Sequence, residues 1–240
     1  MAQPSRPSIR NWPTNMRPRE RLLDEGPQSL SNSELLSIFI RTGTPSRNAI
    51  ELSTDILQHC GGIHALLSSS LEDLQHIHGL GLSKWSQLQA AKEMVRRASL
   101  EKLRERPLLK SQATTREFLQ ATIGHLDYEV FACFFLDQFG YLIEFKILFR
   151  GSTDQTLIYP RQIVKEALQR NASAIIFAHN HPNGVASPSQ ADLRLTIQLQ
   201  KLLKSIEINV LDHIIVTMNS YYSFLDGGQL KNEGFDKFCF

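Results

Sequence analysis

Residues 174 to 192 carry the clearest structural signal in the chain and read Ala-Ile-Ile-Phe-Ala-His-Asn-His-Pro-Asn-Gly-Val-Ala-Ser-Pro-Ser-Gln-Ala-Asp. The first five residues have the apolar, β-branched content of a buried strand. Side chains two positions apart in an extended segment project to the same side, so His179 and His181 present two imidazoles to one point while Asn180 points elsewhere. Gly184 lies in a loop that can reverse the chain, so Asp192 returns a carboxylate to that point.

The end of this stretch predicts the start of a helix. Ser187, Pro188 and Gln190 form a capping-box pattern with Ser187 as the N-cap. This pattern puts Ser189 and Asp192 in the first two turns. The core face of the predicted helix consists of Leu195, Leu199, Leu202, Leu203 and Ile206.

Further strands and helices surround this segment. Residues 129–136 have the content of a buried strand, and residues 143–150 alternate apolar and polar side chains, so the two form a hairpin across the turn at 137–140. Pro160 suits the first position of a helix, and residues 208–216 read as another strand. This alternation predicts an α/β domain, a mixed β-sheet with packed helices.

The N-terminal part of the chain has a helical pattern with short loops. It predicts four helices, one after Ser31 and others over 48–59, 71–77 and 83–106. Pro107 ends the last helix. We therefore predict a small all-helical domain over 1–106, an α/β domain over 107–228 and a C-terminal tail over 229–240.

The composition is that of an ordinary globular protein. The chain has 240 residues, 42% of them hydrophobic and 21% charged, which excludes disordered and collagen-like classes. No apolar run approaches the roughly 20 residues that a membrane-spanning helix needs. The segment before Leu22 contains arginines but no apolar stretch like that of a signal peptide, so we expect a cytoplasmic protein that does not enter a membrane.

Cysteines and charge give weaker signals. Cys60, Cys133 and Cys239 cannot all pair and form no CxxC motif, so we expect reduced thiols. The formal net charge is only +2. Residues 1–106 hold 14 Lys and Arg against 11 Asp and Glu, an excess that permits a nucleic-acid-binding face but is also common on a solvated surface.

Two imidazole nitrogens and one carboxylate oxygen suit zinc. Three protein ligands leave a fourth position for water, as in catalytic zinc sites, and zinc lowers the pKa of that water from ~15.7 to about 7. Ser189, one helical turn before Asp192, can donate a hydrogen bond to the oxyanion of a tetrahedral intermediate. Proton transfer needs a further carboxylate. The candidates in the sequence are Glu129, Glu144, Glu166 and Glu207.

Other interpretations of the two histidines fit the sequence less well. If His179 and His181 were only a pair of core histidines, the spacing of Ser189 and Asp192 relative to them would have no role. In HNH nucleases the motif is spread along a ββα unit rather than contiguous, and the HExxH and zinc-deaminase patterns are absent. His213 lies inside a predicted strand, and we expect it to be a buried, hydrogen-bonded residue rather than a fourth ligand.

The spacing H-x-H-P, six residues, S-x-x-D is similar to the JAMM motif of the JAB/MPN metalloproteases. It is matched by His179, His181, Pro182, Ser189 and Asp192. Flanking and N-terminal segments resemble the bacterial RadC family, so the resemblance covers nearly the whole chain. These segments are LFRG at 148–151, VLDHIIV at 210–216, RPRERLL at 17–23 and IRTGT at 40–44. The chain departs from the RadC pattern at Asn183 and at Val185 and Ala186, all in the loop.

This resemblance implies a cytidine-deaminase-like fold with zinc held by His179, His181 and Asp192. It also implies a glutamate general base at the start of a strand after the first helix of the domain. Glu129 matches that position, and Glu144 is the weaker match. Because proteolytic members of the family cut peptide or isopeptide bonds, we expect a zinc-dependent hydrolase of an amide bond in a peptide or protein.

Residues 74–84, Leu-Gln-His-Ile-His-Gly-Leu-Gly-Leu-Ser-Lys, resemble the start of a helix-hairpin-helix that extends to about residue 95. In such a motif a G-x-G turn and a helix N-terminus approach a phosphate, which makes Gly79, Gly81 and Lys84 the expected contacts. Trp85 stands where small residues are usual, and a plain structural hairpin fits equally well. The alternative function is therefore a non-enzymatic DNA-associated accessory protein, binding DNA without sequence preference, with a vestigial or structural metal site.

Overall fold

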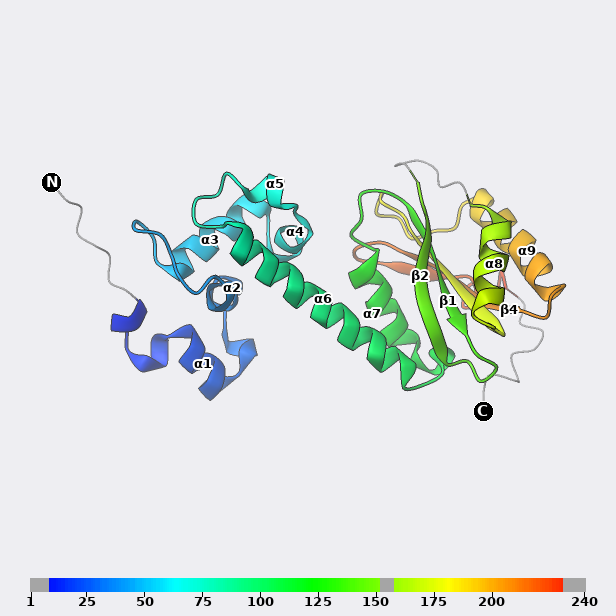
Figure 1. Ribbon diagram of the computed structural model, residues 1–240, viewed down its shortest axis with the longest axis horizontal. Coiled ribbons are helices and arrows are strands. Elements are labelled where there is room, and N and C mark those ends of the chain that lie inside the picture. Colours follow the sequence, from blue (N-terminus) through cyan, green and yellow to red (C-terminus); the bar gives the residue numbers. More distant parts are fainter. Residues whose placement is uncertain (1–8, 152–157, 231–240) are drawn as a thin grey trace. The chain divides into compact units, whose positions relative to one another are not determined.

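The computed structural model describes residues 9–151 and 158–230. The chain forms two compact units, Met1–Val95 and Arg96–Phe240. The point of division lies within α6 (Leu82–Arg104), upstream of Pro107, where the sequence predicts the domain boundary. Helices build the first unit, and the second contains the sheet (Figure 1). The predicted fold class, a helical region before a mixed α/β domain, is confirmed.

The first unit consists of short helices. They are η1 (Ile9–Asn11), η2 (Thr14–Met16), α1 (Pro18–Glu25), η3 (Pro27–Ser29), α2 (Asn32–Ile40), α3 (Ala49–Cys60), α4 (Ile63–Ser68) and α5 (Leu71–Leu74), followed by α6. Capping boxes at Ser31 and Asn48 start α2 and α3. The sequence did not predict α4, because six residues are too few to show a helical period. α5 stops short of the predicted residue 77.

The second unit contains a five-stranded mixed sheet with strand order β2-β1-β3-β4-β5. The strands are β1 (Val130–Leu136), β2 (Leu142–Arg150), β3 (Ala174–Asn180), β4 (Asn209–Val216) and β5 (Tyr221–Ser223). β1 pairs antiparallel with both β2 and β3, while β3 and β4 run parallel. The predicted hairpin is therefore present. The three-residue β5, antiparallel to β4, was too short to predict.

Helices cover both faces of this sheet. Apart from η4 (Leu108–Ser111), they are α7 (Gln112–Thr122), α8 (Pro160–Gln169) and α9 (Gln190–Lys204). Val130, Phe134 and Leu136 of β1 belong to the core cluster under α7. Phe131, Cys133 and Phe135 belong to the cluster under α8 and α9. Because alternate strand residues point to opposite faces, β1 lies between two hydrophobic cores (Figure 1).

The end of the described chain belongs to this second core. Leu230 is only 4% exposed and packs in the cluster under α8 and α9, although the sequence predicts that it belongs to the C-terminal tail. The remainder of that tail, with Cys239, lies outside the described residues. Cys60 and Cys133 are free thiols, in line with the expectation of reduced cysteines.

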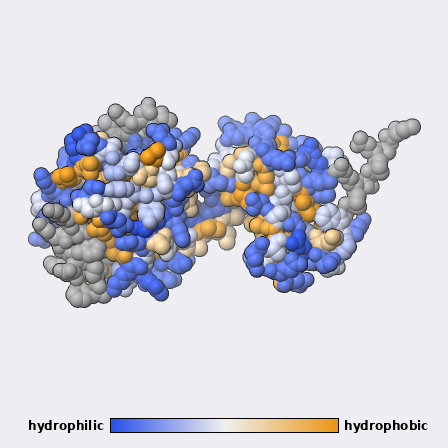
Figure 2. All heavy atoms as spheres, turned by 180° about the vertical axis from the view of Figure 1, so that it is seen from behind, coloured by the Kyte–Doolittle hydropathy of each residue, from blue (hydrophilic) through white to orange (hydrophobic). Residues whose placement is uncertain are grey.

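On the face seen in Figure 2, hydrophilic residues predominate and apolar residues form small groups between them. The larger exposed apolar side chains are spread over many elements, with examples in α1, α6 and α9. Among the described residues, no helix combines the length and apolar character that crossing a membrane requires.

Candidate metal centre

The two histidines of the motif lie at the carboxyl end of β3. His179 is within the strand, and His181 follows it, held by a hydrogen bond from its N–H to Val216 O (3.0 Å). The Nε2 atoms of His179 and His181 are 2.9 Å apart. Asn180 points the other way, where its Oδ1 accepts from Val130 N–H (2.8 Å). The extended backbone thus places both imidazoles on one side, as the two-residue spacing predicts.

Asp192 reaches this point from the first turn of α9. Its Oδ1 lies 3.4 Å from His179 Nε2, and its Oδ2 lies 3.7 Å from His181 Nε2. The prediction that Ser187 caps this helix is wrong, because Ser189 is the N-cap and forms a capping box with Asp192. The sequence Ser187-Pro188-Ser189 contains two possible N-cap residues. With Ser189 as the N-cap, Asp192 occupies the N3 position of the capping box and lies beside the histidines.

The capping box fixes the Asp192 carboxylate. Asp192 N–H donates to Ser189 Oγ (3.1 Å), while the N–H and hydroxyl of Ser189 both donate to Asp192 Oδ2 (2.8 and 2.6 Å). Both hydrogen bonds from Ser189 to Asp192 are accepted by Oδ2. They therefore set the orientation of the carboxylate, whose Oδ1 lies near His179. Ser189 therefore positions the third residue of the group in this structure.

The donor set and its spacing fit zinc. Ligand atoms of His179, His181 and Asp192 all lie within 4.8 Å of one another. Four ligands bound at 2.0–2.1 Å around a tetrahedral zinc ion are about 3.3 Å apart, and the distances from His179 Nε2 to His181 Nε2 and to Asp192 Oδ1 are 2.9 and 3.4 Å. The His179 side chain is 2% exposed, whereas those of His181 and Asp192 are 22% and 14% exposed, so the group opens to solvent on one side.

The protonation states also suit a cation. Burial lowers the pKa of His179 to about 4. A hydrogen bond with Asp192 raises the pKa of His181, against the effect of burial. Burial raises the pKa of Asp192, but the contacts with His181, His179 and Ser189 outweigh it and lower that pKa overall. Near neutral pH the group therefore contains a neutral imidazole at His179 and a carboxylate at Asp192, the forms that bind metal.

A buried chain of hydrogen bonds sets the tautomer of His179. Thr196 Oγ1 donates its single proton to Asp192 O (2.6 Å), so it accepts from His213 Nδ1 (2.6 Å). Burial lowers the pKa of His213 well below its usual value, so this ring is neutral and its Nε2 is unprotonated. That atom accepts from His179 Nδ1 (2.8 Å), which leaves the lone pair of His179 Nε2 facing His181.

His213 is thus a buried, hydrogen-bonded residue, as expected, but it also contacts a residue of the metal motif. The sequence did not reveal this contact. It depends on the parallel pairing of β3 with β4, which puts His213 opposite Phe177. The one local signal for the role of Thr196 is its position four residues after Asp192, which puts both residues on the same side of the helix.

His181 has a different orienting partner. Its Nδ1 donates to the carbonyl oxygen of Val185 (2.9 Å), so in the neutral ring Nε2 carries the lone pair that faces His179. Val185 is one of the positions at which the loop departs from the RadC pattern. Because the contact uses the backbone, the side chain at this position does not affect it.

Glu129 directly precedes β1. The antiparallel register pairs Phe131 with His179, and continuing it by two residues brings Glu129 opposite His181. Glu129 and Phe131 share a face of the strand, since they are two residues apart. The negative charge of Glu129 contributes to raising the pKa of His181. The half-buried carboxylate therefore lies near the group of three.

The other glutamates considered from sequence have different surroundings. Glu144 accepts from Arg170 Nε (2.7 Å), and Glu166 forms ion pairs with Lys146 (2.8 Å) and with Arg170. Glu207 follows α9 with a φ of +62°. None of these three contributes to the pKa values of the metal-motif residues, which sets Glu129 apart.

The predicted DNA contacts lie in the first unit, and one of them has protein partners. Lys84 Nζ donates to Thr42 O (2.8 Å) and Gly79 O (2.7 Å). Gly79 has a φ of +96°, and a Cβ there would lie 2.6 Å from Thr44 Cγ2. Gly81 has open space around it. Trp85 packs against the helical core and donates to Ser69 O (3.2 Å), which accounts for a large residue at this position.

Asp212, next to His213, is expected to make stability depend on pH. Burial raises the pKa of Asp212 to about 6, despite hydrogen bonds from Ser223 and from the N–H groups of Leu225 and His213. Between its ordinary pKa of 3.8 and about 6, the folded state binds more protons than the unfolded state, so stability falls as pH rises through this window.

Asp212→Asn mimics the protonated carboxyl and is expected to remove this dependence. The difference in unfolding free energy, variant minus wild type, should increase by up to about 3 kcal/mol from pH 4 to pH 7. Urea unfolding of both metal-free proteins at each pH measures the difference. Parallel pH profiles would contradict the raised pKa of Asp212.

Two family models match the chain. The RadC-like JAB domain matches residues 109–230, and the UPF0758 N-terminal domain matches residues 9–86. A UPF0758 protein of Ralstonia pickettii is 43% identical over 93% of this chain and 100% of its own length. Another, from Pseudomonas fluorescens, is 46% identical over 87% of this chain and 93% of its own length. The chain belongs to the RadC family of UPF0758 proteins, and its second unit is a JAB/MPN-type domain.

Proposed function

We propose that this chain is a zinc-dependent hydrolase of amide bonds, a metallopeptidase or isopeptidase. The observation that supports it best is the convergence of His179, His181 and Asp192 in a JAB-type domain, with ligand atoms within 4.8 Å of one another. This donor set, two imidazole nitrogens and one carboxylate oxygen, is that of catalytic zinc sites with three protein ligands.

Zinc bound by these three residues supplies a Lewis acid and makes hydroxide available near neutral pH. The roles left to the chain are proton transfer and charge stabilisation. Glu129, beside His181, accepts a proton from the attacking water and returns it to the leaving nitrogen. The Ser189 hydroxyl stabilises the oxyanion, and to donate its proton there it must rotate that proton away from Asp192 Oδ2.

In this hydrolase the Thr196–His213 pair fixes the tautomer of His179 that binds zinc. Thr196→Val keeps the shape of the side chain but removes the hydroxyl that orients His213. Zinc affinity is expected to fall by about 10- to 100-fold, as for other partners of metal-binding histidines. Competition with a chromophoric chelator measures it, with Thr196→Ser as the control that retains the hydroxyl. Equal affinity in the valine variant would show that the pair does not act on the metal.

Hydrolysis itself is tested with the zinc-loaded full-length chain on quenched fluorescent peptides and on isopeptide-linked conjugates. We expect cleavage that stops when a chelator removes zinc and returns when zinc is restored. Cleavage that persists without metal would contradict the proposed mechanism. A fully zinc-loaded protein that cleaves none of these amides would favour the non-enzymatic alternative.

A further inference from the structure

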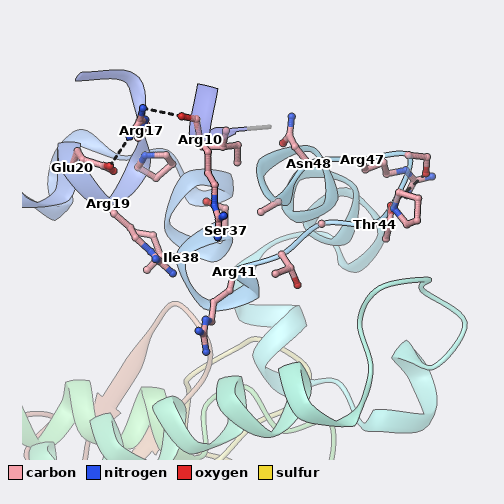
Figure 3. Close-up of a pocket in the computed structure, with 17 residues that line it drawn as sticks. Arg10, Arg17, Arg19, Glu20, Ser37, Ile38, Arg41, Thr44, Arg47 and Asn48 are labelled. Atoms are coloured by element: carbon pink, nitrogen blue, oxygen red, sulfur yellow. Dashed lines mark hydrogen bonds and ion pairs between the residues drawn. The ribbon is translucent and has the colours of Figure 1, made fainter. Parts of the chain in front are cut away.

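Two family-like motifs of the N-terminal part play no role in the metal centre. They are the segments 17–23 and 40–44, which are distant in sequence. In the structure both line one cavity of about 550 Å³ in the first unit (Figure 3). Residues from η1, α1, the end of α2 and the start of α3 complete its walls. Its volume lies within the range of small-molecule binding sites.

The cavity is strongly basic. Five arginines line it, and Glu20 is its one acidic lining residue among the described part of the chain. Glu20 lies 3.5 Å from Arg17, whose charge it offsets. Arg47 forms an ion pair with Asp55 (2.7 Å). The lining arginines are Arg10, Arg17, Arg19, Arg41 and Arg47.

Arg19 and Arg41 are available to a ligand. Both are exposed, and within residues 9–151 and 158–230 neither side chain makes a hydrogen bond or ion pair. Figure 3 shows Arg10 and Arg19 extending toward α2, with Arg41 at its carboxyl end. Arginines from separate elements thus line one cavity, with the Arg41 side chain directed away from Arg10 and Arg19 in Figure 3, and Glu20 is its single acidic lining residue among those described, which favours an anionic ligand.

Hydrogen bonds from side chains to backbone carbonyls hold the walls of the cavity in place. Arg17 donates to Trp12 O (2.9 Å) and Arg10 O (2.8 Å), which fixes η1 beside α1. A Cβ on Gly43 would lie 2.0 Å from Arg47 O, so the loop after α2 needs glycine there. Lys84 anchors the same loop through Thr42 O. The predicted DNA contact Lys84 therefore supports this loop.

Arg41 has an unusual backbone. Its φ of 63° and ψ of −45° lie outside the common regions for a residue with a side chain. Glycine would adopt this conformation more easily, yet the chain has arginine, whose side chain extends freely from the cavity rim. Strain of this kind is concentrated at binding and catalytic sites, where the side chain is needed in that place.

We propose that this cavity binds a phosphate-bearing ligand of nucleotide size. The planar guanidinium fork matches two phosphate oxygens, and charge-assisted bonds of this kind are among the strongest in proteins. Ile9, Ile38 and Pro45 add apolar surface to the lining, against which a base or sugar can pack. The phosphate belongs either to a free nucleotide or to a nucleic-acid strand.

The test measures binding of three probes to the full-length chain at low salt: inorganic pyrophosphate, ATP and a short single-stranded DNA. Isothermal titration is performed on the wild type and on the double variant Arg19→Gln, Arg41→Gln. Because each arginine contributes charge-assisted bonds, the double variant should bind at least about 10-fold more weakly. The control is Arg161→Gln, Lys165→Gln on α8, which removes the same charge from exposed positions of the other unit and should bind normally.

Tight binding of ATP would identify free nucleotides as the source of the phosphate, and binding of DNA alone would identify a strand. Both results support the site if only the Arg19 and Arg41 variant is impaired. Absence of binding by all three probes would overturn the proposal, as would equal weakening in the two double variants. Unchanged zinc content and melting temperature show that the substituted arginines, both exposed, do not affect folding.

Discussion

Replacing His179 and His181 by Ala is expected to reduce bound zinc from about one ion per chain to none. The two rings supply both nitrogens of the donor set, and Asp192 alone cannot hold the ion. The loss should be complete rather than partial because each ring is already oriented, His179 by His213 and His181 by Val185 O. Mass spectrometry of metals in the purified proteins measures the zinc content.

The first unit offers a matched control. His59 and His76 also have their Nε2 atoms 2.9 Å apart, but no third metal-binding residue of the described chain joins them. The His59→Ala, His76→Ala variant is therefore expected to keep its zinc. Retention of zinc by the His179 and His181 variant, or its loss from the control variant alone, would place the metal elsewhere.

Zinc binding should also appear in stability. A ligand that binds only the folded state stabilises it by RT ln(1 + [L]/Kd), about 4 kcal/mol at 1,000 times Kd. The melting temperature of the wild type should therefore rise with added zinc, while that of the His179 and His181 variant should not change. A common rise in both proteins would indicate binding at other groups.

The sequence predicted that His179, His181 and Asp192 lie close together because local geometry determines most of their placement. Alternate residues of a strand point to the same side, which puts His179 and His181 together. The glycine-containing loop then reverses the chain, and the helix that follows brings Asp192 back to the two histidines. The sequence did not determine the cap, since Ser187 and Ser189 both match the pattern. In the structure Ser189 is the N-cap, and Asp192, its partner in the capping box, lies beside the histidines.

Long-range pairing accounts for what the sequence did not show. His213 contacts His179 because β4 lies parallel to β3, whereas Glu129, which the family resemblance had indicated, lies near His181 because β1 pairs antiparallel with β3 on the other side. No local period encodes either neighbour. The basic cavity has the same origin, because it joins residues near position 19 to residues near position 41.

Glu129→Gln is expected to lower turnover of any amide that the zinc-loaded chain cleaves by about 10²- to 10⁴-fold, the usual effect of removing a general base. Glutamine keeps the shape of the side chain but cannot accept a proton. Zinc content should not change, since the donor atoms belong to His179, His181 and Asp192. Turnover per bound zinc is the measurement, so that a loss of metal is not mistaken for a loss of chemistry.

Glu144→Gln provides the control for this prediction. It makes the same chemical change on β2, at the second glutamate that the family pattern suggested, where the carboxylate accepts from Arg170 instead of approaching the histidines. Its turnover should therefore remain near that of the wild type. If Glu129→Gln retains full turnover while Glu144→Gln loses it, the assignment of the base is reversed. Full turnover in both variants would mean that neither glutamate moves the proton, and the chemistry would then depend on the metal group alone.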